Sequence, residues 1–307
     1  MNKVENQYSA KGEVSNVYIR RTMYQRGILT LKKAPFTAWL GMTIIFIYFF
    51  VAIFAPFIAP YGEAQIFKVP YAPWDDVHFF GTDRLGRDIL SRLIYGARNT
   101  MGIALLTTLL AFVIGGGLGL FSAILRGWVD QILARFVDIL MAIPSLIFAL
   151  MLLSIFGSTA LNLIIIIAVL DSTRVFRLSR AVGMNVAVME YVEAAKLRGE
   201  NIGWIMGREI LPNILPPLVA EFGLRFCYVF LMIASLSFLG VGIQPPTADW
   251  GSMVRETGEL IQYAEYDITA ALTPLLPAAA IGILTIGVNF VVDWFLYLTS
   301  GLKDEHQ

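Results

Sequence analysis

The sequence predicts an all-α membrane protein that crosses the bilayer several times, and both its composition and its charge pattern support this fold class. Of its 307 residues, 57% are hydrophobic and 15% are charged, with a mean hydropathy of +0.68, whereas soluble domains carry roughly 25% charged residues. The apolar residues are also clustered, because residues 101–125, 139–170 and 268–292 include no charged side chain. A helix needs about 20 apolar residues to cross a bilayer, so these stretches predict transmembrane helices.

We expect six transmembrane helices within one membrane domain, residues 36–298. As a single helix, the uncharged stretch 139–170 would overshoot the bilayer. Gly157-Ser158-Thr159 is typical of a turn, so this stretch is divided into a third and a fourth span. The expected spans are residues 36–59, 100–125, 136–156, 161–176, 217–241 and 273–298.

The distribution of basic residues predicts the orientation, because cytoplasmic loops are enriched in lysine and arginine. Most of the 23 basic residues fall in the N-terminal tail, in the even-numbered loops and at the C-terminus. Both termini are therefore expected in the cytoplasm, as tails of residues 1–35 and 299–307, together with a long loop at about 180–216. No internal repeat and no cleavable signal peptide is expected.

The loop between the fourth and fifth spans is polar, although it lies between long apolar runs. Its pattern suggests two short helices, residues 191–197 and 204–211, with Gly199 between them where a chain reversal needs positive φ. Pro212, Pro216 and Pro217 are expected to stop the second helix and to restart the chain into the fifth span. Exposed apolar residues, Trp204 and Met206, indicate a docking surface for a partner.

This loop resembles the EAA loop of the permease subunits of bacterial ABC importers. The family pattern is Glu-Ala-Ala, three residues, Gly, nine residues and then Ile-x-Leu-Pro, and Glu209 departs from it at the Ile position. The remaining positions match in register, and they are Glu193, Ala194, Ala195, Gly199, Leu211 and Pro212. Ala194 and Ala195 leave one face of the first helix narrow, so a partner surface could approach closely.

Two further stretches resemble the C-type subunit of the dipeptide and oligopeptide permease group. Residues 80–88, FGTDRLGRD, are similar to its GTDxxGRD stretch. Residues 235–242, SLSFLGVG, followed by Pro245-Pro246 and Asp249-Trp250-Gly251, are similar to the end of its fifth span. The resemblance covers nearly the whole chain after about residue 30, and it implies the ABC importer permease fold.

The resemblance also implies partners and a location. It implies a pore-forming subunit of a bacterial inner membrane that pairs with a homologous second permease. Two cytoplasmic ATPase subunits would dock on the loops, and a periplasmic or lipid-anchored binding protein would deliver peptides or similar solutes. ATP and Mg²⁺ would bind to the ATPase partners, and the sequence agrees because it contains no G-x-x-x-x-G-K-[ST] motif. The Gly115 and Gly119 pair instead predicts a helix-packing face.

The sequence indicates no enzyme activity, cofactor or metal in this chain. His78 and His306 are far apart, and the single cysteine, Cys227, lies in an apolar run. A net charge of zero suggests no nucleic-acid partner. No carboxylate cluster is expected within the spans, which argues against an intramembrane enzyme.

Several charged residues are candidates for the pathway or for a gate. Glu221 and Arg225 are four residues apart in the fifth span and are expected to form an ion pair, with a structural role favoured over a pathway role. Asp83 and Arg87 are expected on an amphipathic external helix, residues 82–92, with Asp83 near its N-cap. The other charged residues near span ends are expected to be interfacial anchors, and they are Arg135, Asp138, Asp171, Arg174 and Arg177.

Alternatives remain for the transport class and for the cargo. A self-sufficient secondary transporter would show more ionisable residues within the membrane and broken helices in both halves, and neither is evident in the sequence. Within the importer class, nickel chelates, glutathione-like or opine-like compounds and oligosaccharides are alternative cargoes.

Overall fold

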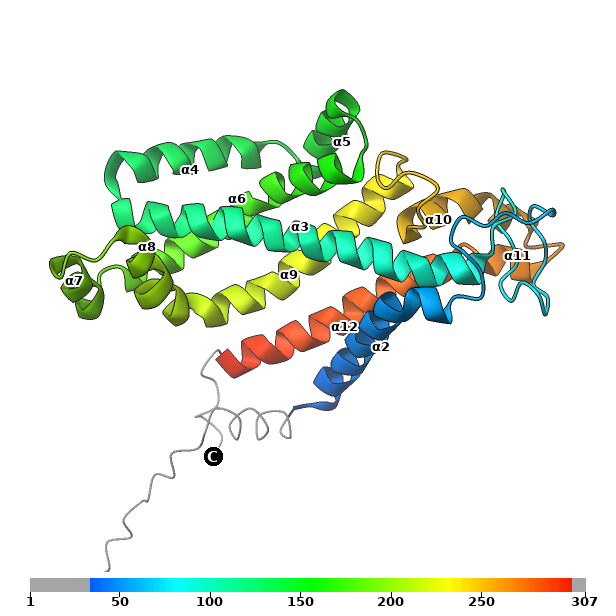
Figure 1. Ribbon diagram of the computed structural model, residues 1–307, viewed down its shortest axis with the longest axis horizontal. Helices are drawn as coiled ribbons and strands as arrows, with labels where there is room; N and C mark the ends of the chain where they lie inside the picture. Colours follow the sequence, from blue (N-terminus) through cyan, green and yellow to red (C-terminus); the bar gives the residue numbers. More distant parts are fainter. Residues whose placement is uncertain (1–33, 300–307) are drawn as a thin grey trace, which may run out of the picture. The chain divides into compact units, whose positions relative to one another are not determined.

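The computed structural model describes residues 34–299 of the chain. Nearly all of the two predicted tails therefore lies outside the described residues. Residues 34–299 form helices joined by loops, with two isolated β-bridges, Ile66 with Arg87 and Thr82 with Asp88. The helices are α2 (Phe36–Ile58), α3 (Ile89–Leu125), α4 (Gly127–Ala142), α5 (Ser145–Phe156), α6 (Ala160–Val186), α7 (Glu190–Leu197), α8 (Ile202–Trp204), the π-helix Ile205–Ile210, α9 (Leu211–Phe238), α10 (Trp250–Thr257), the 3₁₀-helix Gly258–Tyr263, α11 (Ile268–Leu272) and α12 (Leu275–Thr299) (Figure 1).

Four helical segments of the described chain are long and apolar enough to cross a membrane, and they are Phe36–Ile58, Ile89–Leu125, Ile202–Phe238 and Ile268–Leu298. The bent pair α4 and α5 makes a fifth if it is one span. The all-helical membrane fold is thus confirmed, with four to five candidate spans where six were expected. Helix α6 covers the expected fourth span, but it continues to Val186 and its second half carries several charges.

The third span is not the single helix that was expected. Helices α4 and α5 are separate and are bent by 89° relative to each other. Ile143, at the break, is extended with φ −93° and ψ 132°, and Pro144 follows it. Proline disfavours the helical conformation of the residue before it and lacks an N–H donor, which explains the break.

The fifth span begins earlier than expected, because the helix does not stop at the prolines. α9 begins at Leu211, and Pro216 and Pro217 lie inside it. Pro212 stands in its first turn, where a missing N–H costs nothing. The π-helix Ile205–Ile210 leads directly into α9, so the second helix of the predicted loop and the fifth span form one continuous helical segment, Ile202–Phe238.

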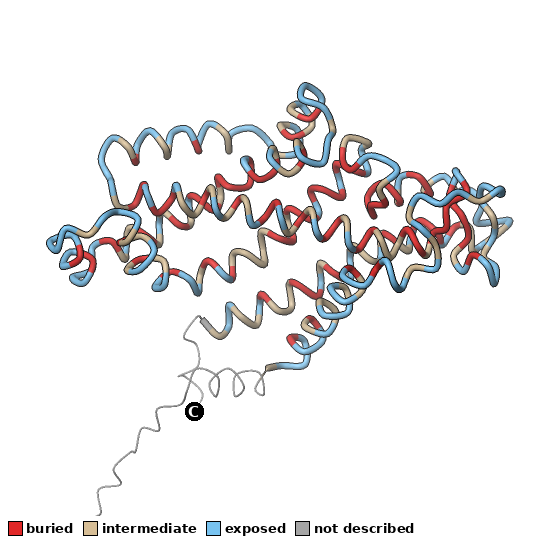
Figure 2. Tube along the Cα trace, in the orientation of Figure 1, coloured by how far each residue is buried: buried red, intermediate tan, exposed pale blue. Residues whose placement is uncertain are grey.

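Among the described residues, α3 and α6 make the most extensive contact between two helices, and glycines bring the two close. A Cβ at Gly115 would collide with the backbone carbonyl oxygen of Ser172, and one at Gly119 would come within 2.7 Å of that of Phe176. The helix-packing face predicted from these glycines is confirmed. Figure 2 shows buried residues along α3 and α6, whereas much of α2 and α4 is exposed.

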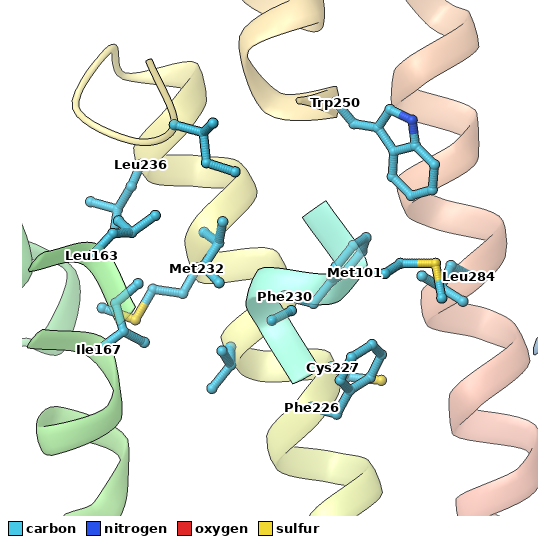
Figure 3. Close-up of a cluster of buried hydrophobic side chains, with 14 of the residues drawn as sticks. Met101, Leu163, Ile167, Phe226, Cys227, Phe230, Met232, Leu236, Trp250 and Leu284 are labelled. Atoms are coloured by element: carbon cyan, nitrogen blue, oxygen red, sulfur yellow. The ribbon is translucent and has the colours of Figure 1, made fainter. Parts of the chain in front are cut away.

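Two hydrophobic cores hold the helices together. The larger one lies between α3, α6, α9, α10 and α12 and includes Met101, Ile167, Phe230, Trp250 and Leu284 (Figure 3). The smaller one, which we call the loop core, joins the predicted loop between α6 and α9 to the ends of the long helices. Its buried members are Leu120, Ala187, Val192, Ala195, Ile205, Ile210, Ile214 and Leu218.

Candidate functional site

The predicted cytoplasmic loop has the helix–turn–helix form that its sequence suggested. α7 spans Glu190–Leu197, and Gly199 follows with φ +80°. The backbone N–H of Gly199 donates to the carbonyl oxygen of Lys196 at 3.0 Å, and that of Glu200 donates to Ala195 at 3.2 Å. These bonds satisfy carbonyl groups at the end of α7. The prediction of positive φ at Gly199 is confirmed.

The second helix of the loop is capped and packed against the first. The side chain of Asn201 accepts a hydrogen bond from the backbone N–H of Trp204 at 2.8 Å. The guanidinium of Arg198 lies 5.9 Å from the centroid of the Trp204 ring and 3.7 Å from the Glu209 carboxylate. Glu209, which departs from the family pattern, thus has a contact across the turn in this chain.

The motif residues of the loop do not all face outward. Ala195 is fully buried in the loop core together with Val192, whereas Glu193 and Ala194 are exposed. The idea that both alanines form one open face is therefore wrong, because they are successive residues and a helix turns by about 100° from one residue to the next. Trp204 and Met206 are partly buried, and Leu211 is too. Pro212 and Leu197 are exposed.

A buried ion-pair cluster, which we call the outer cluster, lies near the opposite end of α3 (Figure 1). The Arg87 guanidinium lies 2.6 Å from the Asp83 carboxylate and 2.8 Å from that of Glu256 in α10. Arg92 lies 3.5 Å from the same two carboxylates. All four side chains are at most 3% exposed. These contacts join the loop before α3 to α10.

The external helix expected at residues 82–92 is wrong. Residues 81–88 form a tight loop, in which Gly81 and Gly86 have positive φ, and the helix begins at Ile89. Asp88, not Asp83, is the N-cap, because its side chain accepts from the backbone N–H of Ser91 at 2.8 Å. The Asp83 carboxylate instead accepts from the N–H groups of Leu85 and Arg87, which holds the loop in shape.

The stretch with Asp249-Trp250-Gly251 fixes α10 onto α3. Asp249 caps α10, accepting from the Ser252 N–H at 2.8 Å and from the Thr100 hydroxyl at 3.0 Å. The Trp250 indole N–H donates to the carbonyl oxygen of Leu93 at 2.9 Å, and its ring packs where a Cβ at Gly96 would collide. Burial raises the pKa of the Asp249 carboxyl above its usual range.

A third group of polar residues, which we call the inner cluster, lies between α6 and α9. The expected Glu221–Arg225 ion pair is present at 2.7 Å. Arg225 also lies 3.5 Å from Asp171, whose side chain is 2% exposed. Asp171 is therefore buried between helices and is not the interfacial anchor that was expected. Asp171 of α6 and Glu221 of α9 thus both pair with the Arg225 guanidinium.

The inner cluster extends to the break between α4 and α5. The Arg174 guanidinium lies 4.4 Å from the centroid of the Tyr228 ring. The Tyr228 hydroxyl lies 2.7 Å from that of Ser145, the first residue of α5. Neither Tyr228 nor Ser145 could be predicted as part of a site from the sequence, because only the tertiary fold brings them together. Arg177 is exposed.

A further ion pair that the sequence analysis missed holds α4 against α6. The Arg180 guanidinium donates to the Asp130 carboxylate at 2.6 Å, and the Ser122 hydroxyl donates to the same carboxylate at 2.5 Å. Arg135 and Asp138 are exposed on α4, and their role as anchors stays a prediction. Among residues 34–299, no group of three or more His, Cys, Asp or Glu side chains could hold a metal ion.

Comparisons with known proteins bear on this chain as a whole. Residues 115–300 match the profile of the binding-protein-dependent transport system inner membrane component, and residues 31–73 match that of the N-terminal transmembrane domain of oligopeptide transport permease C. The dipeptide transport system permease protein DppC of Escherichia coli K12 is 37% identical over 264 residues, covering 83% of this chain and 88% of that protein.

Two other relatives differ in the cargo that their names state. The dipeptide permease DppC of Alkalihalophilus pseudofirmus is 33% identical over 269 residues, covering 87% of this chain and 84% of that protein. The glutathione transport system permease protein GsiD of Pectobacterium atrosepticum is 31% identical over 247 residues, covering 79% of this chain and 82% of that protein.

Proposed function

The chain belongs to the family of binding-protein-dependent transport system inner membrane components, and on this premise we propose that it forms half of the translocation pathway of an ATP-driven peptide importer. The observation that carries this proposal is the cytoplasmic loop. Its exposed residues Glu193 and Ala194 lie on the short helix α7, which the loop core packs against the ends of α3 and α9, and its exposed Pro212 lies in the first turn of α9. Such a surface is rigidly connected to the membrane helices, as energy coupling requires.

Short peptides are the proposed cargo. Several of the similar curated proteins are named as dipeptide or di/tripeptide permeases, including those of Escherichia coli, Haemophilus influenzae and Pseudomonas aeruginosa. The relative named as a glutathione permease makes glutathione-like peptides an alternative. Nickel chelates, opine-like compounds and oligosaccharides are further alternatives within the same class of importer.

The proposed assembly contains four kinds of subunit. A homologous second permease completes the pathway, and two ATPase subunits bind ATP and Mg²⁺ and dock on the loops. A periplasmic or lipid-anchored binding protein delivers cargo to the outer face. The chain itself then catalyses no reaction and lies in the inner membrane of a bacterium, surrounded by lipid, with both termini in the cytoplasm.

We propose six spans for the chain in this assembly. The bent pair α4 and α5 supplies the third, and α6 supplies the fourth, which begins with the apolar residues 160–170 and continues into the second half of the helix. The charged second half of α6 then lies against the inner cluster, where Asp171 and Arg225 form an ion pair. Buried pairing of this kind is how charges are accommodated at membrane depth.

The proposed coupling of ATP hydrolysis to transport depends on the helix that continues from the loop into α9. Closure of the ATPase subunits on ATP would displace the loop, and the helical segment Ile202–Phe238 would carry that displacement to the membrane helices. The loop core, with Val192, Ile210 and Leu218, couples α7 to the same helix. Alternating access then arises from rigid-body motion.

Purification in mild detergent with mass spectrometry of the recovered proteins tests this function. We expect a second permease and two Walker-type ATPases to be recovered, and uptake of labelled dipeptide to require ATP hydrolysis. A chain recovered alone in repeated preparations, with uptake that persists when ATP is depleted, would contradict the proposal.

A self-sufficient secondary transporter is the second candidate. Two observations in the structure favour this candidate. The first is the helix broken at Pro144. The second is the group of charged residues between α6 and α9, which comprises Asp171, Arg174, Glu221 and Arg225. Such transporters combine broken helices with ionisable residues near the membrane midplane. Dependence of uptake on a proton or sodium gradient, with no need for ATP, would support this candidate.

A further inference from the structure

The break between α4 and α5 opens into a cavity of about 290 Å³. Its wall includes Met141, Pro144, Ser145, Thr173 and Arg174, so it lies between the broken span and α6. The volume far exceeds the ~30 Å³ that one water molecule takes up in the liquid. It therefore accommodates a polar group of a small solute together with water.

Non-helical backbone at membrane depth is tolerated where it is buried in protein or lines a water-filled cavity. Residues Ile143 and Pro144 have extended conformations between the two helices, and both are exposed in the chain on its own. Both line the cavity. The break thus has the setting expected of a hydrated passage and not that of a lipid-facing surface.

Arg174 is the charged side chain in the wall of this cavity, and its charge has no direct counterion. In residues 34–299, the carboxylates of the inner cluster, Asp171 and Glu221, are both paired with Arg225, and no ion pair joins Arg174 to a carboxylate. Neither Asp171 nor Glu221 lines the cavity. The charged side chain that faces the cavity is therefore the cationic Arg174, while Asp171, with which it interacts electrostatically, lies outside the cavity wall.

The Arg174 guanidinium is also held in position. It stacks over the Tyr228 ring at 4.4 Å, and its Nη2 lies 3.4 Å from the Tyr228 hydroxyl. Tyr228 in turn lies within hydrogen-bond distance of Ser145, 2.7 Å between the hydroxyl oxygens. An arginine fixed in this way loses little side-chain freedom when it binds an anion, and its planar donors suit a carboxylate.

We propose that this cavity binds the carboxylate of the transported peptide, with Arg174 as the residue that recognises the anion. The proposal rests on the proposed function, and it names the part of the cargo that the pathway recognises. Peptides and glutathione carry a free carboxylate, whereas neutral oligosaccharides do not. Arg174 thereby becomes a specificity determinant within the membrane domain, separate from the selectivity of a binding protein.

Cysteine labelling tests the charge preference of the cavity without requiring transport. The reporter is Met141→Cys in a Cys227→Ser background, with the full chain in its native membrane and its partners present. The probes are an anionic sulfonatoethyl and a cationic trimethylammonioethyl methanethiosulfonate of similar size. We expect Arg174→Gln to lower the ratio of anionic to cationic labelling rates by about tenfold, and Arg174→Lys to keep most of the ratio.

The matched control is Arg135→Gln, which removes the same charge from an exposed position of α4 that does not line the cavity. We expect it to leave the labelling ratio unchanged. An unchanged ratio in Arg174→Gln would overturn the proposal, and so would a reporter that neither probe labels, because the cavity would then be closed to water.

Protection by peptides connects the site to the cargo. Millimolar dialanine is expected to slow labelling of the reporter, whereas dialanine amide, which lacks the carboxylate, is not, and Arg174→Gln should abolish the difference. Equal protection by both peptides, or protection by neither, would overturn the assignment of the carboxylate. Because labelling needs no ATPase activity, a failure here is distinguishable from a failure of the importer function, which the purification and uptake experiment tests.

Discussion

Gly199 shows how a single residue can be required by backbone conformation alone. Its φ is +80°, and a Cβ added there would meet no atom within 4 Å. The requirement therefore comes from the turn between α7 and α8 and not from lack of space. Left-handed backbone costs most residues about 1–2 kcal/mol, but asparagine tolerates it better.

We therefore predict that Gly199→Leu distorts the turn and uncouples ATP hydrolysis from uptake, while the chain still inserts and pairs. Gly199→Asn serves as the control and should retain most of the uptake, since asparagine adopts positive φ. Uptake per ATP hydrolysed, measured in proteoliposomes, checks both variants. Normal coupling in Gly199→Leu would count against the role of this turn.

The outer cluster supports a second prediction for a single residue. Arg87 neutralises two buried carboxylates, Asp83 and Glu256, and removal of one partner from a buried ion pair typically costs about 3–5 kcal/mol. Arg87→Met is expected to lower the thermal unfolding midpoint of the purified chain markedly. Arg84→Met, at an exposed position of the same loop, should change it little; similar losses in both variants would show that the cluster does not hold α10.

For single residues, the sequence predicted the features that depend on residues close by in the chain. The positive φ of Gly199 and the Glu221–Arg225 pair both follow from local spacing. The contacts of Arg87 with Glu256, and of Arg225 with Asp171, join residues far apart in the chain, so no local pattern could indicate them. The roles of Glu221, Arg225, Asp83 and Arg87 in a gate or pathway stay predictions.

Among the helices, the contact between α3 and α6 depends on small residues at one face. A Cβ at Gly115 would collide with the backbone of α6, whereas one at Gly117 would meet nothing within 4 Å. We predict that Gly115→Ala destabilises the domain by about 1–3 kcal/mol, because the two helices must separate.

Gly117→Ala is the matched control, and it should be neutral or stabilising because alanine has the higher helix propensity. Thermal unfolding in detergent, followed by the fluorescence of a thiol dye on Cys227, compares the two variants. Equal stability of both variants would contradict the packing argument.

Proline shows why helix ends could be predicted only in part. Pro144 breaks the third span, whereas Pro216 and Pro217 lie inside a continuous α9. The same residue type therefore has opposite outcomes, because the surrounding packing decides whether the lost hydrogen bond is tolerated. Long apolar runs predicted α2, α12 and the end of α3 closely, but α3 begins at Ile89 and not near residue 100. The break at Pro144 and the path of α9 required the tertiary structure.

For the whole molecule, hydropathy was enough to predict the class of fold but not the surfaces that the fold creates. The loop core draws Leu120 from α3, Val192 from α7 and Leu218 from α9. Residues so distant in the chain are brought together only when the membrane helices pack. The motif in the loop could be read from the sequence, but the burial of Ala195 could not.

We predict that the loop has little structure when it is cut from the membrane helices. A peptide of residues 187–216 lacks Leu120 and Leu218, and helices this short are marginal in water. Circular dichroism of the peptide should show mostly unfolded chain, with no binding to the ATPase subunits. A helical, binding-competent peptide would show that the loop core is dispensable.

The loop core has a consequence for biogenesis. Its residues come from segments that leave the ribosome at different times. The third and fourth spans are synthesised after Leu120 and before Leu218. The surface offered to the soluble subunits therefore comes into being only after insertion and helix packing are complete. Recruitment of the ATPases would then act as an inspection step, in which chains that are inserted wrongly or only in part leave their hydrolytic partners in the cytosol.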